Sequence, residues 1–298
     1  MSTPKLAIVI ASCVGPPFIT RCLKSLAAQV QNTEIEVIVV DRAGGDIAAG
    51  IVRDFPWVKL IRRPAGESVP DLRRRGIEAT TAEYIAIIEE HCVAREDWVP
   101  VILRAIQQPV AAIRGVVADA NYPRLIDWAV YFTEYNAYMP PLPRGTTDDV
   151  CAANCVYRRD LLLKHLPESG SGYWEANLNR TLLAAGETFL SEPDLVVYHT
   201  GPFGFRYYLR QRYLFSRAFA GTRRATVSAG FRLIYLLVAP LLAPLLWARM
   251  ASRVYSKRYR LDKFIQVLPH MVPVTAVYVL GEWVGFLLGP GDSLSEIE

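Results

Sequence analysis

The chain has 298 residues, of which 52% are hydrophobic, and a mean hydropathy of +0.18, which is high for a fully soluble enzyme. This length suits one large α/β domain with a smaller appendage. The five cysteines have no framework spacing, so we exclude a disulfide scaffold and expect reduced thiols. No Asp or Glu occurs between Asp194 and Asp262, yet twelve Arg and Lys do. The net charge of +4 is therefore concentrated in one segment, which favours an anionic partner.

Strands and helices are predicted to alternate at short intervals in the first part of the chain. Apolar, β-branched runs indicate buried strands, and apolar residues at helical spacing indicate helices between them. The predicted strands are 6–11, 36–40, 58–61 and 84–88, and the predicted helices are 19–29, 47–55 and 73–79. This alternation predicts an α/β domain over residues 1–200 with a mostly parallel central sheet. Ligands of such sheets bind beyond the carboxyl ends of the strands, where Asp41 and the triplet Glu89-Glu90-His91 lie.

The pattern is looser beyond residue 116. The stretch Pro140–Val150 is rich in proline and polar residues, which fits either a mobile lid or a plain surface connection. A helix is predicted over 174–185 with Gly186 ending it, and a strand is predicted over 195–199.

The last third of the chain combines basic and apolar segments. Residues 201–228 interleave arginines with aromatic side chains, which predicts a basic amphipathic helix in the headgroup region of a membrane. Residues 229–298 are predicted to form hydrophobic membrane helices and a short tail. Within them, Phe264–Leu288 would extend roughly 37 Å as a helix, enough to cross a bilayer core of about 30 Å. The earlier segment Phe231–Trp247 contains two prolines, so it fits either a full span or a buried or re-entrant hairpin.

Several short motifs occur in a characteristic order. A strand ends in Val39-Val40-Asp41; then come a basic run before a glycine, an acidic triplet after a strand, and an acid at a helix start. The later stretches are Arg73-Arg74-Arg75-Gly76, Glu89-Glu90-His91, Trp174-Glu175 with Ala185-Gly186, and Glu192-Pro193-Asp194 before His199. Over approximately residues 5–220 this order resembles the family 2 glycosyltransferases. The resemblance implies a Rossmann-like GT-A fold and an inverting transfer of a sugar from a nucleotide-diphosphate donor.

The resemblance also implies a divalent metal at the acidic triplet. A cation that bridges the two donor phosphates would neutralise the charge that develops as the diphosphate leaves. We therefore expect Glu89 and His91 to bind the metal, and Glu89 and Glu90 to face the donor. Imidazole is a poor ligand for Mg²⁺ but an acceptable one for Mn²⁺, so both ions are considered. Judged from the residues alone, acids after a strand are also common on solvated surfaces.

Two further residues are assigned to the donor by the same resemblance. Asp41 corresponds to an acid that contacts the nucleotide base or ribose, although Arg42 replaces the acid that often follows it. Arg73 corresponds to a basic residue near the diphosphate, which a guanidinium can bind with two hydrogen bonds. The alternatives are that Asp41 makes local turn hydrogen bonds and that Arg73–Arg75 form a solvated face.

Glu175 is the candidate general base. An inverting transferase needs a carboxylate to accept the proton of the acceptor hydroxyl as that oxygen attacks the anomeric carbon. Counting back from Ala185-Gly186 places Glu175 at the family's catalytic acid, with Trp174 in place of the preceding glutamate. The alternative is an ordinary acidic residue that the helix dipole favours in a first turn.

These features together predict a glycosyltransferase at the cytoplasmic face of the cell inner membrane. The expected partners are a nucleotide-sugar donor, with UDP as the default, a lipid-linked or cell-envelope glycan acceptor, and membrane lipids; no nucleic acid is expected. The apolar run of the N-terminus is too short for a signal peptide. The alternative is a catalytically weak GT-A-like membrane scaffold. A nucleotidyltransferase or a Rossmann dehydrogenase would require a glycine-rich phosphate loop, which Ser12–Pro17 does not provide.

Overall fold

The computed structural model describes residues 4–31, 33–166, 175–201, 204–224 and 227–297. The chain divides into two compact units. The first unit contains residues 1–120 and 138–201, and the second contains residues 121–137 and 202–298. The main boundary lies next to the expected one at residue 200, but the segment 121–137, expected in the first domain, belongs to the second unit.

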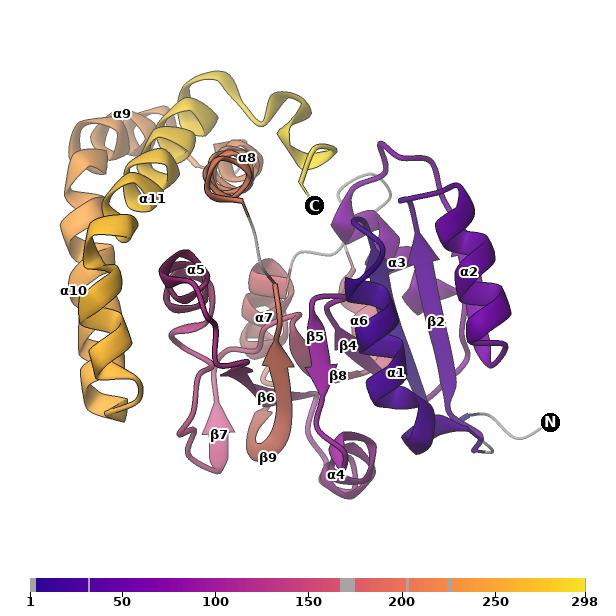
Figure 1. The fold of residues 1–298 in the computed structure, drawn as a ribbon. Coiled ribbons are helices and arrows are strands. Elements are labelled where there is room, and N and C mark those ends of the chain that lie inside the picture. Colours follow the sequence, from indigo (N-terminus) through magenta and orange to yellow (C-terminus); the bar gives the residue numbers. More distant parts are fainter. Residues whose placement is uncertain (1–3, 32, 167–174, 202–203, 225–226, 298) are drawn as a thin grey trace. The chain divides into compact units, whose positions relative to one another are not determined.

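One nine-stranded sheet forms the centre of the first unit, with the order β3-β2-β1-β4-β8-β6-β9-β5 and with β7 paired to β9 (Figure 1). The strands are β1 (Leu6–Ser12), β2 (Glu36–Asp41), β3 (Val58–Arg62), β4 (Tyr84–Ile88), β5 (Cys92–Ala94), β6 (Ala112–Asp119), β7 (Gly145–Thr147), β8 (Asn154–Arg158) and β9 (Phe189–His199). The first four strands are parallel, as predicted. The sheet as a whole is mixed, because β8 pairs antiparallel with both β4 and β6.

Helices cover both faces of the sheet. Every residue of β1 from Leu6 to Ile10 is therefore buried, whichever face it points to. The helices of this unit are α1 (Phe18–Val30), α2 (Asp46–Asp54), α3 (Val69–Glu78), α4 (Trp98–Ala105), α6 (Arg159–His165) and α7 (Glu175–Ala184). Apolar residues of α3, α6 and α7 form one core with β1 and β2, which includes Val9, Val40, Leu72 and Leu182. This core fixes the starts of α3 and α7 relative to the sheet.

The segment Pro140–Val150 is a connection that is attached to the sheet. Its strand β7 pairs antiparallel with β9, and the following Asp149 accepts a hydrogen bond from the hydroxyl of Tyr138. Of the two interpretations that the sequence allowed, the strand pairing supports the plain connection, and the lid stays a prediction.

The second unit is helical. It consists of α5 (Leu125–Tyr135), α8 (Phe205–Arg223), α9 (Ala229–Val238), the 3₁₀ turn η2 (Ala239–Leu241), α10 (Leu242–Lys257), α11 (Leu261–Leu288) and the 3₁₀ turn η3 (Gly291–Leu294). The predicted helix over 264–288 is confirmed as α11. It is the one helix in the described ranges that is by itself long and apolar enough to cross a membrane, by length and composition only. The pair α9 and α10 meets the same criterion only jointly, with a bend of 73° between them.

The helices α8 and α11 lie against each other, and glycines make this close approach possible (Figure 1). A Cβ atom at Gly281 would lie 2.0 Å from Oγ of Ser216, and one at Gly285 would lie 2.4 Å from the carbonyl oxygen of Arg217. Successive glycines of α11 thus meet successive turns of α8. Small residues four apart are the pattern that lets two helix backbones pack closely in or beside a membrane.

Two ion pairs of low exposure hold the second unit together. Arg212 of α8 contacts Glu134 of α5 at 2.5 Å, and Arg223 of α8 contacts Glu282 of α11 at 2.8 Å. Glu282 is 3% exposed and also accepts a hydrogen bond from Tyr235 of α9. The acidic residue within the apolar helix α11 is therefore neutralised by partners from two other helices, as a buried carboxylate requires.

The contact between α3 and the sheet yields a stability prediction. A Cβ atom at Gly76 would lie 2.4 Å from Cγ1 of Val9, so Gly76→Ala should lower the free energy of unfolding by about 1–3 kcal/mol through overpacking. Urea denaturation of the detergent-purified protein measures this change. The matched control is Gly50→Ala in α2, where an added Cβ meets nothing within 4 Å. Equal stability of the two variants would contradict the close contact of α3 with β1.

Candidate functional site

Arg73 lies between two carboxylates that come from distant parts of the first unit. Its Nη2 atom is 3.2 Å from Oε1 of Glu89, the residue after β4, and its Nη1 atom is 3.7 Å from Oε2 of Glu175, the first residue of α7. The structure thus brings together three of the residues singled out in the sequence, including the candidate base. Trp174, the neighbour of that base, lies outside the described residues.

The position of Arg73 follows from the way α3 is built. Ser68 caps this helix by accepting a hydrogen bond from the backbone N–H of Asp71 at 3.2 Å. Leu72 and Ile77 are fully buried in the core shared with the sheet. Arg73 itself is 8% exposed, so its guanidinium is fixed among the residues around it. The alternative interpretation of Arg73 as part of a solvated face is wrong.

The surroundings of Glu175 make its carboxyl group a stronger base than an exposed glutamate. Burial raises the pKa of Glu175 above its ordinary value, and the positive charge of Arg73 opposes this rise. The negative charges of Glu89 and Asp149 raise this pKa further. A carboxylate with a raised pKa accepts a proton more readily at neutral pH, which is what a general base requires.

Glu90 binds the backbone of the loop between β1 and α1. Its carboxylate accepts hydrogen bonds from the backbone N–H groups of Cys13, Val14 and Gly15 at 2.8, 2.9 and 3.2 Å. The residue is 3% exposed. Glu90 therefore shapes the loop between β1 and α1, because both of its oxygens are occupied by that loop. A contact of Glu90 with the donor stays a prediction.

Asp41 lies at the expected strand end and is fully buried. Oδ1 accepts a hydrogen bond from the hydroxyl of Ser12 at 2.9 Å, and Oδ2 accepts one from the backbone N–H of Gly44 at 3.1 Å. These are the local turn bonds that the sequence allowed as an alternative. The guanidinium of the following Arg42 donates to the carbonyl oxygen of Glu67 at 2.5 Å. A contact of Asp41 with a nucleotide stays a prediction.

The ring of His91 packs beside a second histidine that the sequence marked only as the end of the domain. Its centroid is 4.7 Å from that of Phe18 and 6.4 Å from that of His199. Burial, together with the charge of His91, lowers the pKa of His199 to about 3, so His199 is neutral at physiological pH. The β5–β9 pairing brings the two histidines together, and the sequence carried no signal of that pairing.

The donor set at the triplet fits a cation that is shared with a diphosphate. Within the described ranges, no three His, Cys, Asp or Glu side chains are placed to hold a metal ion together. With Glu90 committed to the loop, Glu89 and His91 are the two ligands that the triplet can offer. Divalent cations at phosphates are commonly bound by one or two protein groups, with phosphate oxygens and water completing the shell. A carboxylate and an imidazole suit Mn²⁺ better than Mg²⁺.

Asp149 is a residue near the candidate base that the sequence did not single out. Its carboxylate accepts hydrogen bonds from the hydroxyl of Tyr138 at 2.5 Å and from the amide of Asn179 at 3.1 Å. Asn179 lies in α7, the helix that begins with Glu175. The position of Asp149 in a polar, proline-rich loop gave no signal of this network.

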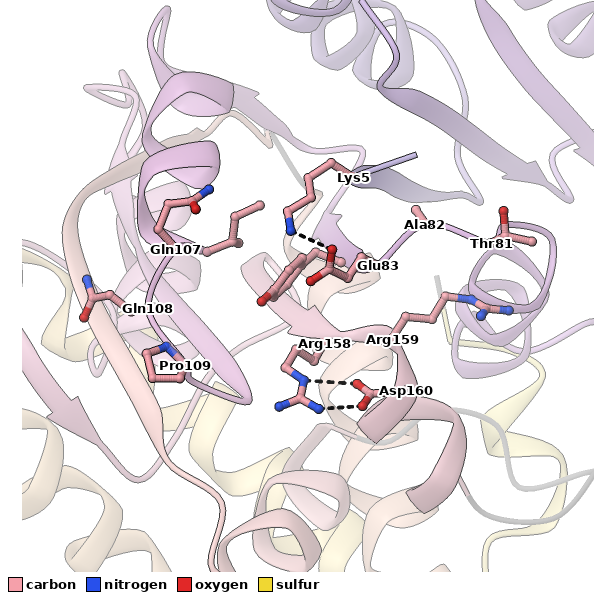
Figure 2. Close-up of a pocket in the computed structure, with 12 residues that line it drawn as sticks. Lys5, Thr81, Ala82, Glu83, Gln107, Gln108, Pro109, Arg158, Arg159 and Asp160 are labelled. Carbon is pink, nitrogen blue, oxygen red and sulfur yellow. Dashed lines mark hydrogen bonds and ion pairs between the residues drawn. The ribbon is translucent and has the colours of Figure 1, made fainter. Parts of the chain in front are cut away.

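A polar cavity of about 540 Å³ lies elsewhere in the first unit (Figure 2). Four of its five charged residues are paired, Lys5 with Glu83 at 2.6 Å and Arg158 with Asp160 at 2.5 Å. The fifth, Arg159, donates to the carbonyl oxygen of Ile77 at 3.4 Å. Lys5 and Glu83 precede β1 and β4, so the cavity lies at the amino ends of these strands. The Arg73 cluster lies at their carboxyl ends, where ligands of α/β sheets bind. None of the predicted site residues lines this cavity.

The fold is similar to those of solved glycosyltransferases. The mannosyltransferase PcManGT from Pyrobaculum calidifontis, solved in complex with GDP-Man and Mn²⁺, matches with a TM-score of 0.58 and 16% identity over 97% of this chain and 88% of that one. Residues 1–349 of TarS from S. aureus match with a TM-score of 0.51 and 15% identity over 95% and 90% of the two chains. At these identities the likeness concerns the fold, and it confirms the GT-A prediction.

Sequence comparison identifies the family. The putative glycosyltransferase EpsH of Bacillus subtilis is 28% identical over 103 residues, which are 33% of this chain and 28% of EpsH. The uncharacterized glycosyltransferase YibD of Escherichia coli is 32% identical over 93 residues, which are 30% of this chain and 26% of YibD. The matches thus span between a quarter and a third of these relatives' lengths. The sequence model of glycosyl transferase family 2 matches residues 7–166, more than half of the chain, and the chain therefore belongs to this family.

Proposed function

We propose that this protein transfers a sugar, with inversion, from a nucleotide-diphosphate donor to a lipid-linked or cell-envelope glycan acceptor. The observation that carries the proposal is the cluster of Glu175, Arg73 and Glu89, which combines a base of raised pKa with a buried cation. Membership of family 2 and the GT-A fold support the same reaction class.

The chemistry assigns one step to Glu175. The acceptor oxygen forms a bond to the anomeric carbon while the bond from that carbon to the diphosphate oxygen breaks, and its electron pair leaves with the diphosphate. The acceptor hydroxyl loses its proton to the carboxylate of Glu175. Arg73 stabilises the ionised form of Glu175 before the reaction and so opposes the rise in pKa that burial causes.

Glu89 and His91 are the proposed ligands of a divalent cation. When it is bound, this cation supplies positive charge to the leaving diphosphate. The P. calidifontis counterpart was solved with GDP-Man and Mn²⁺, which supports a nucleotide-sugar donor and Mn²⁺ in this chain. Asp41 is proposed to contact the nucleoside after a rearrangement of its turn bonds. Because of this counterpart, GDP is a candidate nucleotide in addition to UDP, the nucleotide expected from the sequence.

The second unit is proposed to attach the enzyme to membrane lipids at the cytoplasmic face of the inner membrane. Large apolar side chains are exposed on three of its elements, for example Leu233 and Leu237 of α9, Leu245 of α10 and Leu288 of α11. Twelve arginines and lysines, without any acid, lie between Asp194 and Asp262 in sequence. Apolar side chains next to many cations suit an anionic lipid surface.

A membrane scaffold without transferase activity is the second candidate. It is favoured by one observation: the carboxylates of Asp41 and Glu90, both expected to contact the donor, accept hydrogen bonds from groups within the protein. The two proposals differ in whether the protein binds a nucleotide and turns it over.

Nucleotide binding tests the proposed donor site. Detergent-purified protein should bind one of UDP, GDP and dTDP in the presence of Mn²⁺, and EDTA should weaken this binding at least tenfold. His91→Ala should cause a similar loss, because it removes a proposed ligand. Glu175→Gln should bind the nucleotide as wild type does and lose sugar transfer by a factor of about 10² or more. Isothermal titration and nucleotide release measure the two effects. Folded protein that binds no nucleotide would overturn the proposal and leave the scaffold.

Co-sedimentation with liposomes tests the proposed membrane surface. The double variant Ile234→Lys/Leu237→Lys should bind vesicles that contain phosphatidylglycerol at least tenfold more weakly, because two exposed apolar side chains can no longer enter the lipid. Both side chains are exposed, at 62% and 74%, so the fold should persist. The control is Val52→Lys, at an exposed apolar position of α2 in the first unit. Unchanged vesicle binding of the double variant would contradict the assignment.

A further inference from the structure

The segment before β8 is bound to helix α7 through a pair of polar side chains. The amide nitrogen of Asn179 donates to Oδ1 of Asp149 at 3.1 Å and to the carbonyl oxygen of Val150 at 2.9 Å. The amide oxygen of Asn179 accepts a hydrogen bond from the hydroxyl of Tyr157 at 2.6 Å. Tyr138 donates to the second oxygen of Asp149 at 2.5 Å.

The side chains of Asn179 and Tyr157 are nearly withdrawn from solvent, whereas those of Asp149 and Tyr138 are partly exposed. Asn179 is 2% exposed and Tyr157 is 1% exposed. A buried amide left without its partners would lose about 1–3 kcal/mol per unsatisfied group. The geometry therefore resists both a rotation and a slide of α7 at the position of Asn179.

Asn179 lies four residues after Glu175 in the same helix. Residues four apart lie on one face of an α-helix, about one turn from each other. A bond that fixes Asn179 thus also fixes the direction in which the first turn of α7 presents Glu175. Among the described residues, Glu175 also forms an ion pair with Arg73 at 3.7 Å.

We propose that Asp149, fastened by Tyr138 and Asn179, is a positioning residue that holds α7 so that the carboxylate of Glu175 faces the reacting atoms. The proposal rests on the proposed function, in which Glu175 is the general base. It assigns a role in the reaction to a loop residue that lies outside the motifs of the sequence.

The charge of Asp149 acts on Glu175 in the same direction as that of Glu89. Among the described residues, the groups that interact electrostatically with Glu175 are Arg73 from α3, Glu89 after β4, Asp149 before β8, and the neighbouring Tyr138 and Cys151. Burial raises the pKa of both Tyr138 and Cys151, so these two groups are neutral at physiological pH. Asp149 is therefore a negative charge whose removal should lower the pKa of Glu175.

The experiment compares three variants of the full chain. Asp149→Asn removes the charge and keeps the shape, because its amide can donate to the oxygen of Tyr138 and accept from Asn179. Asn179→Leu removes the bond between α7 and the loop and leaves the charge. Asp148→Asn is the matched control, because Asp148 is the exposed neighbour of Asp149 in the same loop. The measured quantity is Mn²⁺-dependent release of nucleotide diphosphate from GDP-mannose and from UDP-glucose between pH 5 and pH 9.

The proposal expects a separate change for each variant. Asp149→Asn should move the acid limb of kcat/KM to lower pH by about 0.5 to 1 unit, since Glu175 then has a lower pKa and stays ionised at lower pH. Asn179→Leu should lower kcat at least tenfold with the donor KM within twofold, because the base is misplaced while the donor contacts persist. Asp148→Asn should behave as wild type. A residue that acts only on folding would change thermal stability without moving the acid limb.

Glu175→Gln separates this proposal from the proposed function. If Glu175→Gln abolishes turnover while Asp149→Asn and Asn179→Leu keep the wild-type acid limb and kcat, the positioning role is overturned and the proposed function stands. If Glu175→Gln turns over donor as wild type does, the proposed function fails and the positioning role fails with it.

Discussion

The guanidinium of Arg73 holds two carboxylates together that would otherwise repel each other. Glu89 follows a strand in the first third of the chain, and Glu175 begins a helix 86 residues later in sequence, yet both contact the same side chain. At 8% exposure this cation is weakly screened by water, so its charge acts strongly on both neighbours. The proposed metal ligand Glu89 and the proposed base Glu175 therefore share one fixed charge. A shift of α7 would change the ion pair of Glu175 with Arg73 and, through Arg73, the surroundings of Glu89.

Adjacent acids in the triplet have opposite uses, and the difference depends on the loop they face. Glu89 points its charge at Arg73, whereas Glu90 is enclosed by three backbone N–H groups of the loop after β1. A loop without a glycine-rich phosphate motif needs another way to satisfy those N–H groups, and a buried carboxylate provides it. The same logic applies to Asp41, whose oxygens bind Ser12 and Gly44.

The sequence predicted those parts of the fold whose patterns are local. The first four strands and helix α7 lie within a few residues of their expected bounds, because apolar runs and a terminal glycine mark them. Strand β8 was missed because Asn154–Arg158 is a short run that is placed by pairing with β4 and β6, and pairing is not a local property. For the same reason the sequence did not predict the ion pairs of Arg73 with Glu89 and Glu175, because the three residues are far apart along the chain. The roles of Glu90 and Asp149 depend on backbone groups and helix faces that no single stretch of sequence reveals.

The pH dependence of donor turnover in Arg73→Gln tests the shared cation most directly. Arg73 stabilises the ionised form of Glu175, so its removal should raise the pKa of Glu175 and move the acid limb of kcat/KM to higher pH by about 1 unit or more. Arg73→Lys keeps a positive charge, so its acid limb should lie close to that of the wild type. An acid limb at the wild-type pH in Arg73→Gln would contradict the account, because Glu175 would then be ionised without the cation on which the site is built.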